Sequence, residues 1–141
     1  MPQMIFINLP VHDLTRSKTF YEALGFSFNP EFTNDNAGCL VISDVIHVML
    51  LTYPFFRTFT DRPITDPKDG IAHLLALSRD DRAGVDAITD AALAAGGTET
   101  RPAQDYGFMY ARAFADPDGH VWEPLHMDLA MMRAGRAATP A

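Results

Sequence analysis

The chain has 141 residues and a formal net charge of -7, which suits one acidic domain and leaves little room for two independent cores. No two of its 11 Lys and Arg residues are adjacent, which argues against binding nucleic acid through clustered phosphate contacts. No apolar run approaches the roughly 20 residues that cross a bilayer, and the first residues lack the features of a signal peptide, so we expect a cytoplasmic protein that contacts no membrane.

The first half of the chain predicts the order strand, helix, strand, strand, strand. Asp13 or Thr15 can cap a helix that runs to about Leu24, and Gly25 suits its left-handed end. Asn29-Pro30 interrupts the second strand, which places it at an edge or a bulge. The four strands are predicted over residues 4–11, 26–32, 37–43 and 46–52.

A change in composition follows between residues 53 and 70. This segment contains Phe55, Phe56 and Phe59 together with Pro63, Pro67 and Gly70, which break regular structure. It reads as a connection between two halves. Its aromatic side chains are too many for a solvated linker, so we expect part of it to pack down, either on this chain or on a second copy.

The second half repeats the same order of elements. A helix is predicted after residues 78–81 (SRDD), which resemble a capping box starting at Ser78, and Gly96-Gly97 ends that helix. A short helix and a frayed tail are predicted after residue 127. The four strands are predicted over residues 71–78, 98–101, 108–114 and 120–126.

Cysteine occurs once, as Cys39 within the apolar run of residues 39–42. A single cysteine excludes an intramolecular disulfide and a zinc site built on cysteines. We expect a buried thiol that packs as a small apolar side chain.

Three stretches carry a recognisable pattern: NLPVHDL at residues 8–14, AAGG at 94–97 and FADPDGHVWE at 114–123. In this order they resemble the vicinal oxygen chelate superfamily of glyoxalases, bleomycin resistance proteins and extradiol dioxygenases. The resemblance is strongest to a glyoxalase-like branch that carries QDYGFMY, here residues 104–110. It implies an α+β fold in which two βαβββ modules form a cup-shaped mixed sheet with the helices outside. The implied division is one domain, with modules at 4–52 and 71–126, a connection at 53–70 and a tail at 127–141.

Metal-dependent members of the superfamily hold a divalent ion with side chains from the first and last strand of each module. The resemblance maps those positions onto Phe6, Leu50, His73 and Glu123. Phe6 and Leu50 offer no nitrogen or oxygen lone pair and suit an apolar pocket wall instead. His73 with Glu123 is a sensible half-site for zinc, nickel, manganese or iron(II), if Asn8, His47, water or substrate completes it. Strand alternation counts against His47, which should point away from Leu50.

A second candidate site lies near the start of a strand in the second half. Tyr106, Phe108, Tyr110 and Arg112 share one strand face, where they could stack a flat ligand and hold an anionic group. Ordinary packing of aromatic residues explains the same pattern. Turn geometry alone accounts for Asp105 and Gly107.

Three functions stay open at this point. The first is a protein that binds a small organic molecule in the cup of the sheet, without a complete metal site. Its ligand-binding residues would be Phe6, Asn8 and Leu50 together with the face of Tyr106, Phe108, Tyr110 and Arg112, called the tyrosine face below. The second is a metal-dependent lyase, isomerase or dioxygenase that uses His73 and Glu123. The third is a metal-free isomerase or lyase with Glu123 as general base. The family also leads us to expect a homodimer, with the aromatic connection as a plausible contact.

Overall fold

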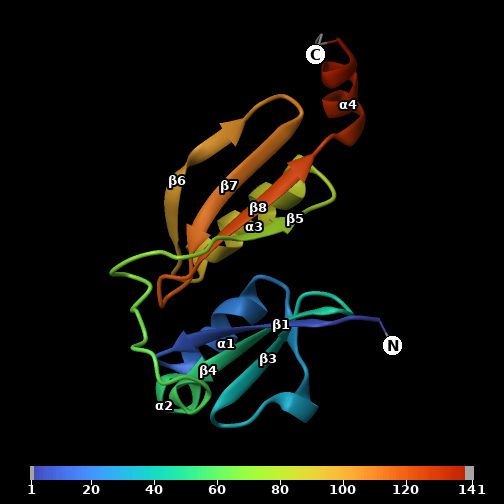
Figure 1. The fold of residues 1–141 in the computed structure, drawn as a ribbon. Helices are drawn as coiled ribbons and strands as arrows, with labels where there is room; N and C mark the ends of the chain where they lie inside the picture. The colour runs from blue at the N-terminus through green and yellow to red at the C-terminus, as the bar shows by residue number, and fades with distance from the viewer. Residues whose placement is uncertain (1, 139–141) are drawn as a thin grey trace.

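The computed structural model describes residues 2–138 and has an α+β fold built from two copies of one βαβββ unit (Figure 1). The first unit, here the first module, contains β1 (Ile5–Val11), α1 (Leu14–Ala23), β2 (Ser27–Phe28), β3 (Ala37–Val41) and β4 (Ile46–Thr52). The second module contains β5 (Leu75–Ser78), α3 (Arg82–Ala94), β6 (Thr98–Asp105), β7 (Met109–Ala115) and β8 (Val121–Met127). Short helical turns occur at Pro30–Phe32, Tyr53–Phe56 (α2) and Arg57–Phe59, and α4 spans Leu129–Ala138.

Each module forms its own four-stranded sheet. The strand orders are β1-β4-β3-β2 and β5-β8-β7-β6, which are the same topology. The first and last strands of each module pair in parallel, and the remaining pairs are antiparallel. Among the described residues no strand of one sheet pairs with a strand of the other, so the two sheets lie next to each other without sharing hydrogen bonds. The cup shape stays an expectation from the resemblance.

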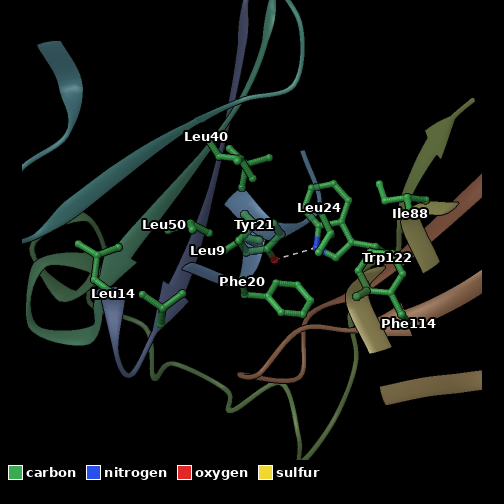
Figure 2. Packing of buried hydrophobic residues seen from close by; sticks show 13 residues of the cluster. Leu9, Leu14, Phe20, Tyr21, Leu24, Leu40, Leu50, Ile88, Phe114 and Trp122 are labelled. Atoms are coloured by element: carbon green, nitrogen blue, oxygen red, sulfur yellow. Dashed lines mark hydrogen bonds between the residues drawn. The ribbon is translucent and has the colours of Figure 1, made fainter. Parts of the chain in front are cut away.

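Alternation along the strands of the first module separates a core face from a face that we call its open face. Leu9, Leu40 and Leu50 are fully buried and belong to the same apolar cluster as Phe20 and Tyr21 of α1 (Figure 2). The open face carries the residues of opposite parity, which include Phe6, Asn8, His47 and Met49. In the second module the core face carries Phe114 and Trp122, and the open face carries Ala76, Ala113 and Glu123.

One apolar core spans both modules (Figure 2). Phe20 packs against Phe114 with ring centroids 6.3 Å apart, and Tyr21 meets the edge of Trp122 at 5.8 Å. The Tyr21 hydroxyl donates to Asp116 Oδ2 at 2.6 Å and accepts a hydrogen bond from Trp122 Nε1 at 2.9 Å. Burial, with the nearby Asp116 carboxylate, raises the pKa of Tyr21, so the phenol keeps the proton that it donates.

The helix starts follow local capping chemistry. Asp13 caps α1 by accepting from Arg16 N at 3.0 Å, which confirms one of the two caps expected there. The expected capping box starting at Ser78 is wrong. Ser78 is the last residue of β5, and Asp81 caps α3 instead by accepting from Gly84 N at 2.6 Å.

Three predicted strands differ from the structure by more than two residues at one end. β2 has only two residues, because Asn29 caps a helical turn that begins at Pro30. β6 extends to Asp105 and has two register shifts around Arg101, where Pro102 cannot donate to the ladder. β5 begins at Leu75 rather than at residue 71. No helix among residues 2–138 is both long and apolar enough to cross a membrane.

Candidate functional site

A cavity of about 670 Å³ lies where the two modules and their connection meet. Its walls are residues 8–10 and Leu51 of the first module, much of the segment between residues 56 and 73, and residues 119–121 before and at the start of β8. Residues 71–74, expected to extend β5, are irregular, and the first three of them line this cavity. The connection therefore packs onto its own chain, as its aromatic content predicted.

Contacts with the first module hold the connection in place. His12 stacks on Tyr53 with ring centroids 4.2 Å apart, and its Nε2 lies 3.4 Å from Asp66 Oδ2. Asp66 also accepts from the backbone N–H of Lys68 at 2.9 Å, and this hydrogen bond lowers the pKa of the carboxyl. Gly119 has φ +102°, and a Cβ there would lie 2.9 Å from Lys68 Cγ and 3.2 Å from its backbone nitrogen. Only glycine lets the connection come this close.

The turn at residues 116–120 forms another wall and is fixed by buried hydrogen bonds. Asp116 Oδ1 accepts from the backbone N–H groups of Asp118, Gly119 and His120 at 2.9–3.0 Å. His120 Nε2 donates to the carbonyl oxygen of Pro10 at 2.7 Å. The wall is therefore joined to β1, so the cavity shape depends on both modules.

Glu123, the expected catalytic carboxylate, lies on the open face of the second module in an ion pair. Its Oε2 accepts from Arg101 Nη2 at 2.5 Å and from Nε at 3.2 Å. The side chains are 18% and 28% exposed. Arg101 Nη1 is buried and has no hydrogen-bond partner among the described residues. Neither residue lines the cavity.

The sequence did not indicate Arg101 as a site residue. The two register shifts that flank it in β6 hide its alignment with β7, where it pairs with Ala113. The only available signal was the alternation of β8, which puts Glu123 opposite the buried Trp122 and so on a face where a partner is needed.

The side chains present do not fit the metal centre that the superfamily implies. Glu123 is already bound by a guanidinium. His73 is exposed in the irregular segment before β5, and among the described residues it makes no hydrogen bond to Glu123. The strand register pairs Glu123 with Ala76, and Met49 with Asn8, so Met49 rather than Leu50 is the counterpart of Glu123. Within residues 2–138 no three His, Cys, Asp or Glu side chains gather where they could hold a metal ion.

The predicted ligand residues of the first module lie in three different places. Asn8 lines the cavity. Phe6 is 48% exposed on the open face and stacks on His47 at 4.9 Å, while His47 Nδ1 is buried without a hydrogen-bond partner. Leu50 lies in the core, facing α1. The structure therefore brings only Asn8 and His73 of the predicted set to this cavity.

The tyrosine face of β7 packs against α3, on the opposite side of the sheet from Glu123. Tyr110 donates to Asp86 Oδ1 at 2.7 Å, which raises the pKa of Tyr110. Arg112 binds Asp86, Asp90 and Glu99 at 2.9–3.1 Å. Its guanidinium is therefore occupied by three carboxylates and is not available to an anionic ligand unless they move.

The other predicted residues of this cluster lie near the turn between β6 and β7. Tyr106 is exposed and stacks on Phe108 with ring centroids 6.4 Å apart. Asp105 is bound by both terminal nitrogens of Arg82 at 2.7 and 2.8 Å. The hydrogen bonds from Arg82, with a smaller contribution from Gly107 N–H, lower the pKa of Asp105 to about 2.

Part of the first module is similar to a known protein family. The family described as bleomycin resistance protein-like N-terminal matches residues 3–43. A search of curated proteins finds no significant match.

Solved structures are similar to nearly the whole chain. A hypothetical protein from S. aureus has 25% identity and a TM-score of 0.76, over 89% of this chain and 94% of that one. A glyoxalase-related enzyme from Fulvimarina pelagi has 24% identity and a TM-score of 0.76, over 89% and 88%. A bleomycin resistance determinant encoded on the transposon Tn5 has 21% identity and a TM-score of 0.63, over 90% and 99%. The match of the first module and the shared fold both support the resemblance to the vicinal oxygen chelate superfamily.

Proposed function

We propose that this chain binds a small organic molecule in the cavity where the two modules and the connection meet. The observation that carries the proposal is the cavity itself. Its volume of about 670 Å³ lies within the range of roughly 300–1,000 Å³ that is typical of small-molecule sites. Its lining is mostly apolar, with a few polar side chains that include Asn8, Arg62 and His73.

The names of two proteins with the same fold are in keeping with this role. One is a bleomycin resistance determinant and the other a glyoxalase-related enzyme. At 21% and 24% identity they support the fold and leave the ligand to be argued from the cavity.

We further propose that binding needs no resident divalent metal. The Arg101 guanidinium already neutralises Glu123, the one carboxylate at a family ligand position. On the open face of the first module Asn8, His47 and Cys39 lie near Met49, and no described carboxylate accompanies them in the strand pairing. This donor set supports a ligand site shaped by packing and hydrogen bonds rather than by coordination.

A thermal-shift screen with matched cavity variants tests the proposal. A ligand that binds only the folded chain stabilises it by mass action, by about 2.7 kcal/mol at 100 times Kd. Ala72 lines the cavity and is exposed, so Ala72→Phe should fill space without disturbing the core. We expect Ala72→Phe to abolish the shifts produced by hit compounds. Ala87→Phe, on the exposed side of α3, should keep them.

A second filling variant makes the result decisive. Ile64→Trp should also remove the shifts, because Ile64 lines the same cavity from the connection. Hits that keep their full shift in both Ala72→Phe and Ile64→Trp would show that the ligand binds elsewhere. Elemental analysis of protein purified without chelator tests the metal-free part, and stoichiometric Zn, Ni, Mn or Fe would contradict it.

We also propose a homodimer that covers the open faces. Phe6 on the open face of the first module and Leu74 before β5 are exposed apolar side chains, which favour contact with a second copy. Sedimentation should give twice the monomer mass of 15.6 kDa. Phe6→Asp should shift the protein to monomer, whereas a monomeric wild-type chain would contradict the proposal.

A further inference from the structure

The charge of the cavity lining differs from that of the chain as a whole. The protein has 18 Asp and Glu residues and a net charge of -7. None of these acidic residues is among the 19 that line the cavity, which do include Arg62 and two histidines. The nearby carboxylates are exposed or occupied elsewhere, as Asp66 is by Lys68 N and His12. The lining of the cavity therefore carries basic side chains and no acidic side chain, although the protein as a whole is acidic.

Arg62 is available to a ligand. Its backbone N–H donates to Thr60 Oγ1 at 3.1 Å, which fixes its position in the connection. Among residues 2–138 its guanidinium has no ion pair or hydrogen bond, whereas Arg82, Arg101 and Arg112 are each bound to carboxylates. A guanidinium presents a planar pair of N–H donors that match two oxygens of an acid group.

His73 adds a second nitrogen donor at the same cavity, and it too has no partner among the described residues. The third candidate, His120, is engaged with the carbonyl oxygen of Pro10. Polar recognition of an acid group therefore falls to Arg62 and His73, which come from the connection and from the segment that precedes β5.

The rest of the lining is apolar and partly aromatic. Phe56 and Phe59 contribute rings, and Leu51, Ile64 and Val121 contribute aliphatic side chains. Such walls favour a ring system over a flexible polar chain. A cationic group placed here would find no carboxylate among the lining residues to pair with, which discriminates against it.

We infer that the cavity selects a ring-bearing organic acid, whose anionic group is bound by Arg62 with support from His73. This inference rests on the proposed function and adds the charge and shape of the ligand. It assigns the residues that decide specificity to the connection and to the segment that precedes β5.

Three probes that share one ring system test the inference: 2-naphthoate, 2-naphthamide and the 2-naphthylmethylammonium ion, titrated calorimetrically at about 150 mM salt. We expect 2-naphthoate to bind at least tenfold more tightly than the amide, and the ammonium ion to bind most weakly. Arg62→Ala should weaken 2-naphthoate at least fivefold and change the amide less than twofold. Arg62→Lys should keep part of the preference, and His73→Gln should lose about threefold.

Arg133→Ala is the matched control, because it removes the same charge from an exposed position on α4. It should leave all three affinities unchanged, since exposed charges beyond about 8–10 Å are screened at this salt. Equal binding of the acid and the amide, or tighter binding of the ammonium ion, would overturn the charge selection while leaving the cavity as a ligand site. Screening hits that depend on Ala72 but include no acid would do the same. If no compound binds in a manner sensitive to Ala72→Phe, the proposed function fails first and the inference with it.

Discussion

The two modules share a topology but differ in what their open faces carry. In the first module the partners of β1 and β4 are Asn8 with Met49, and in the second the equivalent pair is Ala76 with Glu123. The second module supplies Arg101 to that carboxylate, and the first has no charge at the matching place. Helix caps and strand order are therefore repeated, whereas the chemistry of the open face is not.

The two modules also differ in burial, and the first module is the more deeply buried. β1 has seven residues and β5 has four, and Leu9 in β1 is almost wholly buried while its counterpart Leu77 is half-buried. The first module holds most of the shared apolar core. Stability should depend more on the first module, and the second is freer to vary.

The largest expected effect comes from truncating Leu9 and Leu77, which occupy equivalent positions in the two modules. Leu9→Ala should lower the free energy of unfolding by about 2–5 kcal/mol, because it leaves a cavity in a fully packed core. Leu77→Ala should cost roughly half of that or less, because its site is already partly open to water. Denaturant unfolding of both variants measures the difference. Equal losses would contradict the asymmetry.

Substitutions that make the open face of the second module resemble that of the first should have an intermediate effect on stability. Arg101→Met or Glu123→Met alone should each destabilise by about 1–3 kcal/mol, because a half-buried charge loses its partner. The double variant should lose less stability than the sum of the two single losses. The Glu123→Met change also gives the second module the Met that the first module carries at residue 49. A double-mutant cycle by thermal and chemical unfolding gives the coupling. Additive losses would mean that the pair does not act as a unit.

The smallest expected effect concerns Arg82, whose counterpart at the start of α1 is the buried Leu14. The folded pKa of Asp105 is about 2, below the usual value near 3.9, so its stabilising contribution is present above about pH 4 and is lost as pH falls through about 2. Because the pair is exposed, the effect on stability should be slight and sensitive to salt. Carboxyl NMR of Asp105 should show a midpoint near 2.

Arg82→Gln supplies the control for that titration. The midpoint should rise toward the ordinary value but stop short of it, since Gly107 N–H still donates to Asp105. An unchanged midpoint would show that Arg82 does not hold the carboxylate in solution.

The order and type of the main elements could be predicted because apolar periodicity and turn residues are local signals. Gly25 and Gly96 have positive φ, as their predicted place at helix ends requires. The sequence also predicted that Tyr110 and Arg112 share a face, and both contact Asp86 of α3. It could not tell that this is the helix side, because residues on both faces of β7 are apolar enough to be buried.

The site was harder to predict because it depends on register and on irregular segments. The family resemblance mapped matching ligand positions onto Leu50 and Glu123. The strand pairing makes Met49 the counterpart of Glu123 instead, and a shift of one residue reverses the face. The apolar residues 71–74 looked like strand and are irregular. The sequence did not indicate Arg62 as a site residue, because the role proposed for it depends on a cavity formed by segments far apart in the chain.

Asp118 joins the start of α1 to the second half of the chain. Its Oδ1 accepts the backbone N–H of His12 at 2.8 Å, and its Oδ2 accepts the hydroxyl of Ser17 at 3.2 Å. The carboxylate of Asp118 is buried. In a separated first half, His12 N–H and Ser17 Oγ would have to bind water instead. In a separated second half, the carboxylate would lose these hydrogen-bond donors. A chain cut within the connection should therefore regain its structure only when both fragments are mixed. The two modules therefore depend on each other for their structure, and neither should fold as an independent unit.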